Sequence, residues 1–124
     1  MQVEGNIRFD IVEQDDEQVR GEMPVQPGIL NPYGTVHAGA TLWFADVCAT
    51  VLAFGGDPAT SGGKGFPLAI SLNANLLGNQ SEGRFRAVST FVKRGRQVQV
   101  IRTRVTGDGD RVIAEVTTSH VAAG

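Results

Sequence analysis

The feature that most constrains the fold is a long apolar segment, residues 38–54, that carries one acidic residue, Asp46, near its middle. The segment is short for a membrane span, and a lipid-facing helix would tolerate Asp46 poorly. Gly55 and Gly56, followed by Pro58, are typical of a helix C-terminus. Because the segment is apolar on nearly every side, we expect a central helix over residues 37–53 that other structure surrounds.

Segments with strand-like patterns lie on both sides of this helix. Residues 27–35, rich in Pro, Gly and Asn, predict a structured loop that leads into the helix. Short polar turns between successive strands favour antiparallel neighbours. The pattern therefore predicts an α+β domain in which a curved antiparallel sheet packs around one long helix. The expected strands are residues 7–12 and 18–25 before the helix, and residues 68–76, 84–92, 97–106 and 112–121 after it.

Length and composition set the class of protein. A chain of 124 residues suits a single domain, residues 1–124, that is large enough to bury a core. With 11 basic and 13 acidic residues the net charge is -2, which excludes the electrostatic footprint of a dedicated nucleic-acid binder. The single cysteine, Cys48, excludes an internal disulfide and a multi-cysteine zinc site. Residues 1–4 lack the start of a secretory signal, so we expect a cytoplasmic protein. From the single cysteine we expect no metal, and from Asp46 in the apolar segment we expect no membrane attachment.

Asp46 is the first candidate for chemistry. An ionised carboxylate in an apolar helix costs several kcal/mol to bury unless it is paired or needed. Basic residues are absent one helical turn away, whereas Thr50 follows at i+4 and shares its face. One reading is that Asp46 bonds to backbone at a sheet or subunit seam. The functional reading makes Asp46 a general base or a nucleophile.

The predicted helix start is the second candidate. The amides near His37, Ala38 and Gly39 have no intrahelical acceptor and lie at the positive end of the helix dipole. Such amides can polarise a carbonyl and hold the oxyanion that forms when it is attacked. Gly34 and Gly39 allow a substrate to approach the backbone closely.

Taken together, these residues match a family pattern. The stretch Asn31-Pro32-Tyr33-Gly34-Thr35-Val36-His37-Ala38-Gly39-Ala40, followed by Asp46, resembles the signature of hotdog-fold acyl-CoA thioesterases of the PaaI-like branch. The resemblance extends over the chain and includes Gly95-Arg96 at a late hairpin. It implies a six-stranded antiparallel sheet wrapped around the helix and homodimers with active sites shared between subunits. It also implies tetramers formed as dimers of dimers.

The resemblance also implies catalytic roles. Asp46 is expected to be the catalytic acidic residue, which acts as a general base on water or as a nucleophile. The backbone amide of Ala38 is expected to form the oxyanion hole. Asn31, from the facing subunit, orients water or the thioester carbonyl, and Thr50 positions the attacking water. His37 supports the geometry at the helix start. Where the family usually has His-Gly-Gly, the middle residue here is Ala38, whose methyl can crowd the thioester or narrow the acyl choice.

Further residues are candidates for contacts with the substrate. The basic cluster near the predicted 93–96 turn suits CoA phosphates, or is a solvated hairpin tip. Asn73 and Asn75 alternate along one strand and so lie on one sheet face, where they either line the pantetheine channel or contribute to a polar dimer seam. The expected substrate-binding residues are Gly39, Tyr33, Asn73, Asn75, Lys93, Arg94 and Arg96.

The acyl group remains open between aryl and medium-chain groups. Candidate pocket liners are Tyr33, Trp43, Phe44 and Phe66, and residues 55–67 are expected to form a loop that caps the pocket. Two other residues are expected to take no part in the chemistry. Cys48 is interpreted as a small core residue, and His120 as a bystander on an edge strand.

The sequence thus predicts an acyl-CoA thioesterase that releases a free acid and CoA. The substrate supplies the CoA, and no separate cofactor is expected. Two alternatives stay open. One is a hydroxyacyl dehydratase or hydratase of the same fold, which the chain resembles around residues 27–30. The other is an acyl-CoA-binding protein without catalysis.

Overall fold

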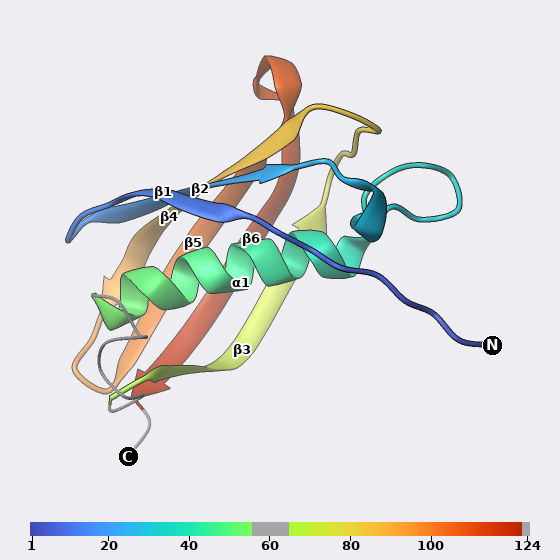
Figure 1. The fold of residues 1–124 in the computed structure, drawn as a ribbon. Coiled ribbons are helices and arrows are strands. Elements are labelled where there is room, and N and C mark those ends of the chain that lie inside the picture. The colour runs from blue at the N-terminus through green and yellow to red at the C-terminus, as the bar shows by residue number, and fades with distance from the viewer. Residues whose placement is uncertain (56–64, 123–124) are drawn as a thin grey trace.

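The computed structural model describes residues 1–55 and 65–122 (Figure 1). Strands β1 and β2 precede a short 3-10 turn and helix α1, and four longer strands follow. The bounds are β1 Asp10–Gln14, β2 Gln18–Pro24, the 3-10 turn Pro27–Ile29, α1 Ala38–Phe54, β3 Pro67–Leu76, β4 Arg84–Arg94, β5 Val98–Thr106, a second 3-10 turn Asp108–Asp110 and β6 Val112–Ala122. The predicted loop over residues 55–67 lies largely outside the described residues.

The described strands form one antiparallel sheet in the order β1-β2-β4-β5-β6-β3, and α1 lies along its concave face (Figure 1). Strands β1 and β3 are the two edges. The expected α+β architecture, with a curved sheet around one helix, is confirmed. The helix begins and ends within one residue of the prediction and stops at Gly55, whose left-handed φ of 75° closes it.

The chain before β1 differs from the prediction. A strand was expected over residues 7–12, but the ladder begins at Asp10. Ile7 and Phe9 instead pack against the core. The centroid of the Phe9 ring lies 5.2 Å from the Phe44 ring centroid and 6.2 Å from the Trp43 ring centroid. The alternating pattern of this segment therefore reflects packing on the helix rather than pairing in the sheet.

The prediction that His120 lies on an edge strand is wrong. Strand β6 is last in the chain but sits between β5 and β3, because the chain returns after α1 to pair β3 with β6. His120 is 1% exposed. Alternate residues of β6, among them Val116, Thr118 and His120, are buried on the face toward the helix.

The core lies between α1 and the sheet. Phe44, Ala45, Cys48 and Ala49 of the helix are fully buried there. The absence of a side chain at Gly21 lets strand β2 approach α1 closely, because a Cβ at this position would lie 2.6 Å from the Cys48 Sγ. Burial raises the pKa of the Cys48 thiol to about 12, so it is a core thiol, as predicted. No helix among the described residues is long and apolar enough to cross a membrane.

Candidate active site

The loop before α1 is shaped by Asn31. Its side-chain Oδ1 accepts hydrogen bonds from the backbone N–H of Tyr33 (2.9 Å) and of Thr35 (3.1 Å), and its Nδ2 donates to the Thr35 Oγ1 (2.8 Å). Gly34 completes the turn with a φ of 81°, a conformation that L side chains rarely adopt. Within one protomer the Asn31 side chain therefore holds the loop in shape, and its predicted role toward substrate stays a prediction.

The segment between this loop and the helix is fixed by a residue that the sequence did not single out. The Asn79 side chain accepts a hydrogen bond from the Val36 N–H (3.1 Å) and donates one to the Val36 carbonyl (2.8 Å). The next amide, that of His37, donates to the Ile29 carbonyl (2.9 Å). These bonds set the position of the first residues of α1. Asn79 lies in the turn after β3, where periodicity carries no signal.

Replacing Asn79 with Ala is expected to lower the free energy of unfolding by about 1–3 kcal/mol, because it leaves both backbone groups of Val36 unpaired in a half-buried place. Chemical denaturation measures the change. Gln97→Ala, which truncates an exposed amide in the β4–β5 hairpin, is the matched control and is expected to leave stability unchanged. Equal stability of the two variants would show that the Asn79 bonds do not hold the helix start.

The helix start has two amides without an intrahelical acceptor, and the cavity beside it is lined by Gly39 but not by Ala38. Intrahelical bonding begins with the N–H groups of Ala40 and Thr41, which both donate to the His37 carbonyl (3.0 and 3.3 Å). The N–H groups of Ala38 and Gly39 precede these bonds, and both residues are exposed. A cavity of about 180 Å³ lies here, and a Cβ on Gly39 would meet nothing within 4 Å. Among its lining residues are Gly5, Gly28, His37, Gly39 and Trp43.

Asp46 lies on the side of α1 that meets β3. Its Oδ1 is buried and has no hydrogen-bond partner among the described residues. A second cavity, of about 310 Å³, is lined by Asp46, Thr50, Phe66 and residues 67–69. The predicted shared face of Asp46 and Thr50 is confirmed, since both line this cavity. An unpaired carboxylate in an apolar cavity is a typical setting for a general base or a nucleophile.

The two halves of the predicted site are far apart within one protomer. Ala38 and Asp46 are eight residues apart on one straight helix, which separates them by about 12 Å along its axis. A single thioester carbonyl cannot contact both the Ala38 amide and the Asp46 carboxylate of the same chain. The two halves of the predicted site therefore do not meet within one chain.

The predicted substrate contacts are spread over the surface. Asn73 and Asn75 pair with Thr117 and Glu115, on the outer face of the sheet that points away from α1 and Asp46. Tyr33 is 94% exposed. Within one chain the structure therefore does not bring Tyr33, Asn73 and Asn75 together around Asp46, and their roles toward substrate stay predictions.

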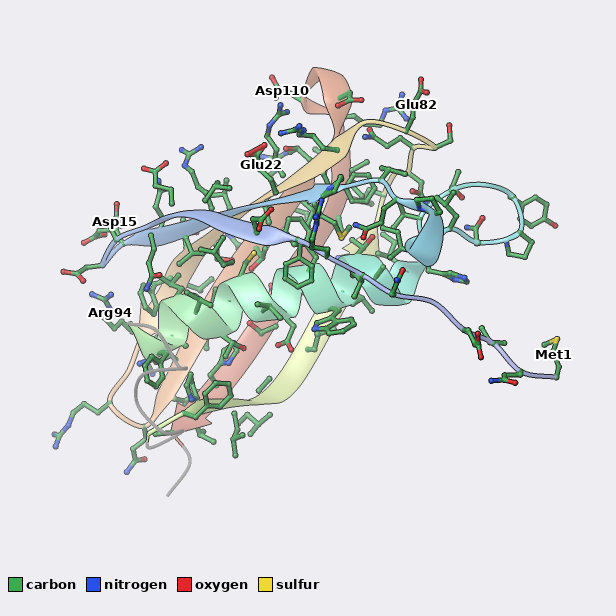
Figure 2. The ribbon with its side chains drawn as sticks, in the orientation of Figure 1. Met1, Asp15, Glu22, Glu82, Arg94 and Asp110 are labelled. Atoms are coloured by element: carbon green, nitrogen blue, oxygen red, sulfur yellow. The ribbon has the colours of Figure 1, made fainter. Side chains whose placement is uncertain are left out.

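The basic cluster divides into two parts. Lys93 and Arg94 belong to the end of β4 rather than to a turn, because a bulge near Phe91 lets pairing with β5 continue. The Arg94 guanidinium lies 4.1 Å from the Phe91 ring centroid and donates to the Asp16 carbonyl, beside the turn that carries Asp15 (Figure 2). Lys93 and Arg96 line a surface depression at the hairpin. These two cations, rather than Arg94, are placed to receive an anion.

The predicted pocket liners also separate. Phe44 is 0% exposed and belongs to the core. Trp43 lines the cavity at the helix start, whereas Phe66 lines the Asp46 cavity. The orientation of α1 about its axis turns Trp43 toward the cavity at the helix start and Phe44 toward the core. The sequence alone does not show this orientation.

Comparison with known proteins decides the family. The sequence model described as the thioesterase superfamily matches residues 33–120, well over half of the chain. The chain belongs to the thioesterase superfamily. The match includes the end of the loop before α1, from Tyr33 on, the helix with Asp46, strands β3 to β5, and β6 as far as His120. The fold of this thioesterase-superfamily protein is the hotdog fold that the sequence predicted.

Individual relatives agree with this assignment. The esterase PA1618 of Pseudomonas aeruginosa is 28% identical over 102 residues, covering 82% of this chain and 67% of its own. A crystal structure of PA1618 superposes with a TM-score of 0.80 at 25% identity, over 94% of this chain and 81% of that one. The esterase ComA2 of Bacillus subtilis is 27% identical over 105 residues, covering 85% of this chain and 81% of its own.

A more distant structure shares the fold. It is that of a thioesterase protein with coenzyme A from Streptococcus pneumoniae, which is 19% identical. The similarity covers 94% of this chain and 90% of that one, with a TM-score of 0.80. Nothing in these comparisons separates the PaaI-like branch from other thioesterases, so that assignment stays a prediction.

Proposed function

We propose that this protein is an acyl-CoA thioesterase of the PaaI-like branch, with Asp46 as its general base or nucleophile. The observation that carries the proposal is the Asp46 carboxylate, whose buried Oδ1 has no partner among the described residues and which borders an apolar cavity. Membership of the thioesterase superfamily supplies the reaction class.

Acyl-CoA is the proposed substrate. The Streptococcus pneumoniae thioesterase protein was crystallised with coenzyme A, and a structure from Streptococcus mutans with the same fold contains acetyl-CoA. In this chain, Lys93 and Arg96 offer a local anion site on a surface that is otherwise mildly acidic. We assign them to the CoA phosphates.

The proposed enzyme works as a homodimer with shared sites. About 12 Å of helix separates Ala38 from Asp46, so a second copy must bring its own helix start to the Asp46 cavity. Strand β3 offers the surface for this, because it is a sheet edge with unpaired backbone groups and exposed apolar side chains. The exposed apolar residues on β3 are Leu68, Ile70, Leu72 and Leu76. Dimers of dimers are the proposed final assembly.

The chemistry follows from these positions. The Ala38 N–H of one copy binds the thioester oxygen and stabilises the oxyanion that forms on attack. Asp46 of the other copy either takes the proton of the attacking water or attacks the carbonyl itself to give an anhydride. Thr50, which lines the same cavity, positions the water. Collapse of the tetrahedral intermediate breaks the C–S bond, and the CoA thiolate leaves and takes up a proton. On the general-base route this step also releases the free acid, whereas on the nucleophile route water must then hydrolyse the Asp46 anhydride to release the acid and restore the carboxylate.

A panel of acyl-CoA thioesters with short, medium-chain and aryl groups tests this proposal, with thiol release as the readout. Hydrolysis of at least one class supports it. Dehydration of a 3-hydroxyacyl-CoA without thiol release would instead favour the dehydratase. Tight binding without turnover of any thioester would favour an acyl-CoA-binding protein.

A further inference from the structure

Three buried polar atoms lack a partner in the part of the chain that the structure describes. They are Asp46 Oδ1 on α1, Gln99 Oε1 on β5 and His120 Nδ1 on β6. Folded proteins contain few such atoms, and each requires a physical explanation. Here all three arise in one region between the helix and the sheet.

Strand register shows how close these groups are. Gln99 and His120 are direct cross-strand partners on β5 and β6, so their side chains share the face toward α1. On the other side His120 pairs with Ala69 of β3, which also lines the Asp46 cavity. The charge of Asp46 acts on His120 and favours its protonated form. The three orphan atoms therefore form one cluster, which we call the polar cluster.

Two members of the polar cluster line a small polar cavity, and Pro67 lines both this cavity and the neighbouring Asp46 cavity. The volume of the small cavity is about 80 Å³, which is enough for ordered water. Gln99 and His120 line it from the sheet, and Arg96 lines it from the β4–β5 hairpin. A water there has polar partners within reach.

One end of the His120 ring is anchored. The Nε2 atom lies 2.8 Å from the Thr118 Oγ1, which is also buried. If the hydroxyl donates to Nε2, the ring carries its proton on Nδ1, which makes no hydrogen bond of normal geometry although the Pro67 carbonyl is near enough to raise the pKa of the ring. A single water that accepted from His120 Nδ1–H and donated to Asp46 Oδ1 and to Gln99 Oε1 would satisfy all three atoms.

We propose that His120 is a positioning residue for Asp46, joined to its inner carboxylate oxygen through a water that Gln99 also holds. The inference rests on the proposed function and extends it to a residue outside the signature. His120 touches no substrate in this scheme. It orients the Asp46 carboxylate so that the outer oxygen faces the cavity where the thioester is attacked.

The arrangement has a consequence for acid pH. Burial lowers the pKa of His120 more than the Asp46 carboxylate and the Pro67 carbonyl raise it, so the ring is neutral near pH 7. Among the described residues, the charged groups that face it are Asp46 from α1 and Arg96 from the hairpin, whereas Gln99 and Ala69 are uncharged. Protonation of His120 at acid pH therefore places a positive charge beside the Asp46 carboxylate.

An NMR titration of the two histidine rings tests the pairing without any activity. In Asp46→Asn the carboxylate that favours protonated His120 is gone, so its titration midpoint is expected to move to lower pH by roughly 0.5–1 unit. The exposed His37 ring is the internal reference for sample conditions in the same spectra. An unchanged His120 midpoint overturns the inference.

Kinetics provide the second test. His120→Gln is expected to lower kcat by roughly 10- to 100-fold through misplacement of the carboxylate. The acid limb of kcat/KM is expected to differ from that of the wild type, because the substituted side chain cannot become positive. Ser119→Ala, the neighbouring position on the opposite face of β6, is the control with an unchanged profile.

The outcomes separate this inference from the proposed function. A loss of kcat at every pH with no movement of the acid limb indicates a merely structural role and refutes the inference. A coupled NMR titration in a wild-type protein that hydrolyses no thioester supports the pairing and refutes the proposed function.

Discussion

Asp46→Asn is expected to lower kcat for thioester hydrolysis by about 10²- to 10⁴-fold, the usual contribution of a general base. The amide has the same shape as the carboxylate but neither accepts a proton from water nor attacks a carbonyl. The protein is expected to stay folded, because the substitution removes a partly buried charge that has no ion pair among the described residues. Thiol release over the acyl-CoA panel measures the loss.

Asp110→Asn is the matched control. Asp110 is exposed in the turn before β6, away from α1 (Figure 2), and its φ of 59° suits Asn as well as Asp. This variant makes the same chemical change and is expected to keep wild-type turnover. Full activity in Asp46→Asn, with native circular dichroism, would remove Asp46 from the mechanism.

Ala38→Pro is expected to lower kcat by about 10²- to 10³-fold, because it deletes one oxyanion-hole N–H. The position tolerates proline unusually well. Ala38 is the first residue of α1, where a proline has no intrahelical bond to break. The preceding residue, His37, has φ -59° and ψ 137°, the extended conformation that a following proline favours.

Ala38→Gly is the control for this position. Glycine keeps the N–H and removes only the methyl, so hydrolysis is expected to persist, with acyl groups that the methyl excludes admitted as well. Thermal unfolding of both variants should stay near that of the wild type. If Ala38→Pro kept full activity while its fold was native, the oxyanion would have to be stabilised elsewhere.

Local patterns predicted most of the fold. The apolar segment with Gly55 after it defined α1 within one residue, and period-two patterns located the strands that follow. The error at residues 7–9 is instructive: Phe9 alternates as a strand residue does, yet its ring packs on Phe44 and Trp43. Alternation reports that one face is buried and does not report whether the backbone is paired.

The candidate site was predictable only where its residues are close in sequence. Asp46 and Thr50 are one helical turn apart, and the structure places both on one cavity. Asn79 contacts Val36 from 43 residues away, and the charge of Asp46 reaches His120 only because β6 pairs with β3. Neither contact follows from spacing. The order of strands in the sheet brought these residues to the site.

A subunit-mixing experiment tests the central claim, that Asp46 of one copy works with the helix start of another. Asp46→Asn and Ala38→Pro copies, carrying different tags, are expressed together, and the mixed dimer is purified through both tags. Each variant alone is expected to be nearly inactive. The mixed dimer regains one intact site of two and should show about half of the wild-type kcat. A mixed dimer no more active than its two parents would contradict a site shared between subunits.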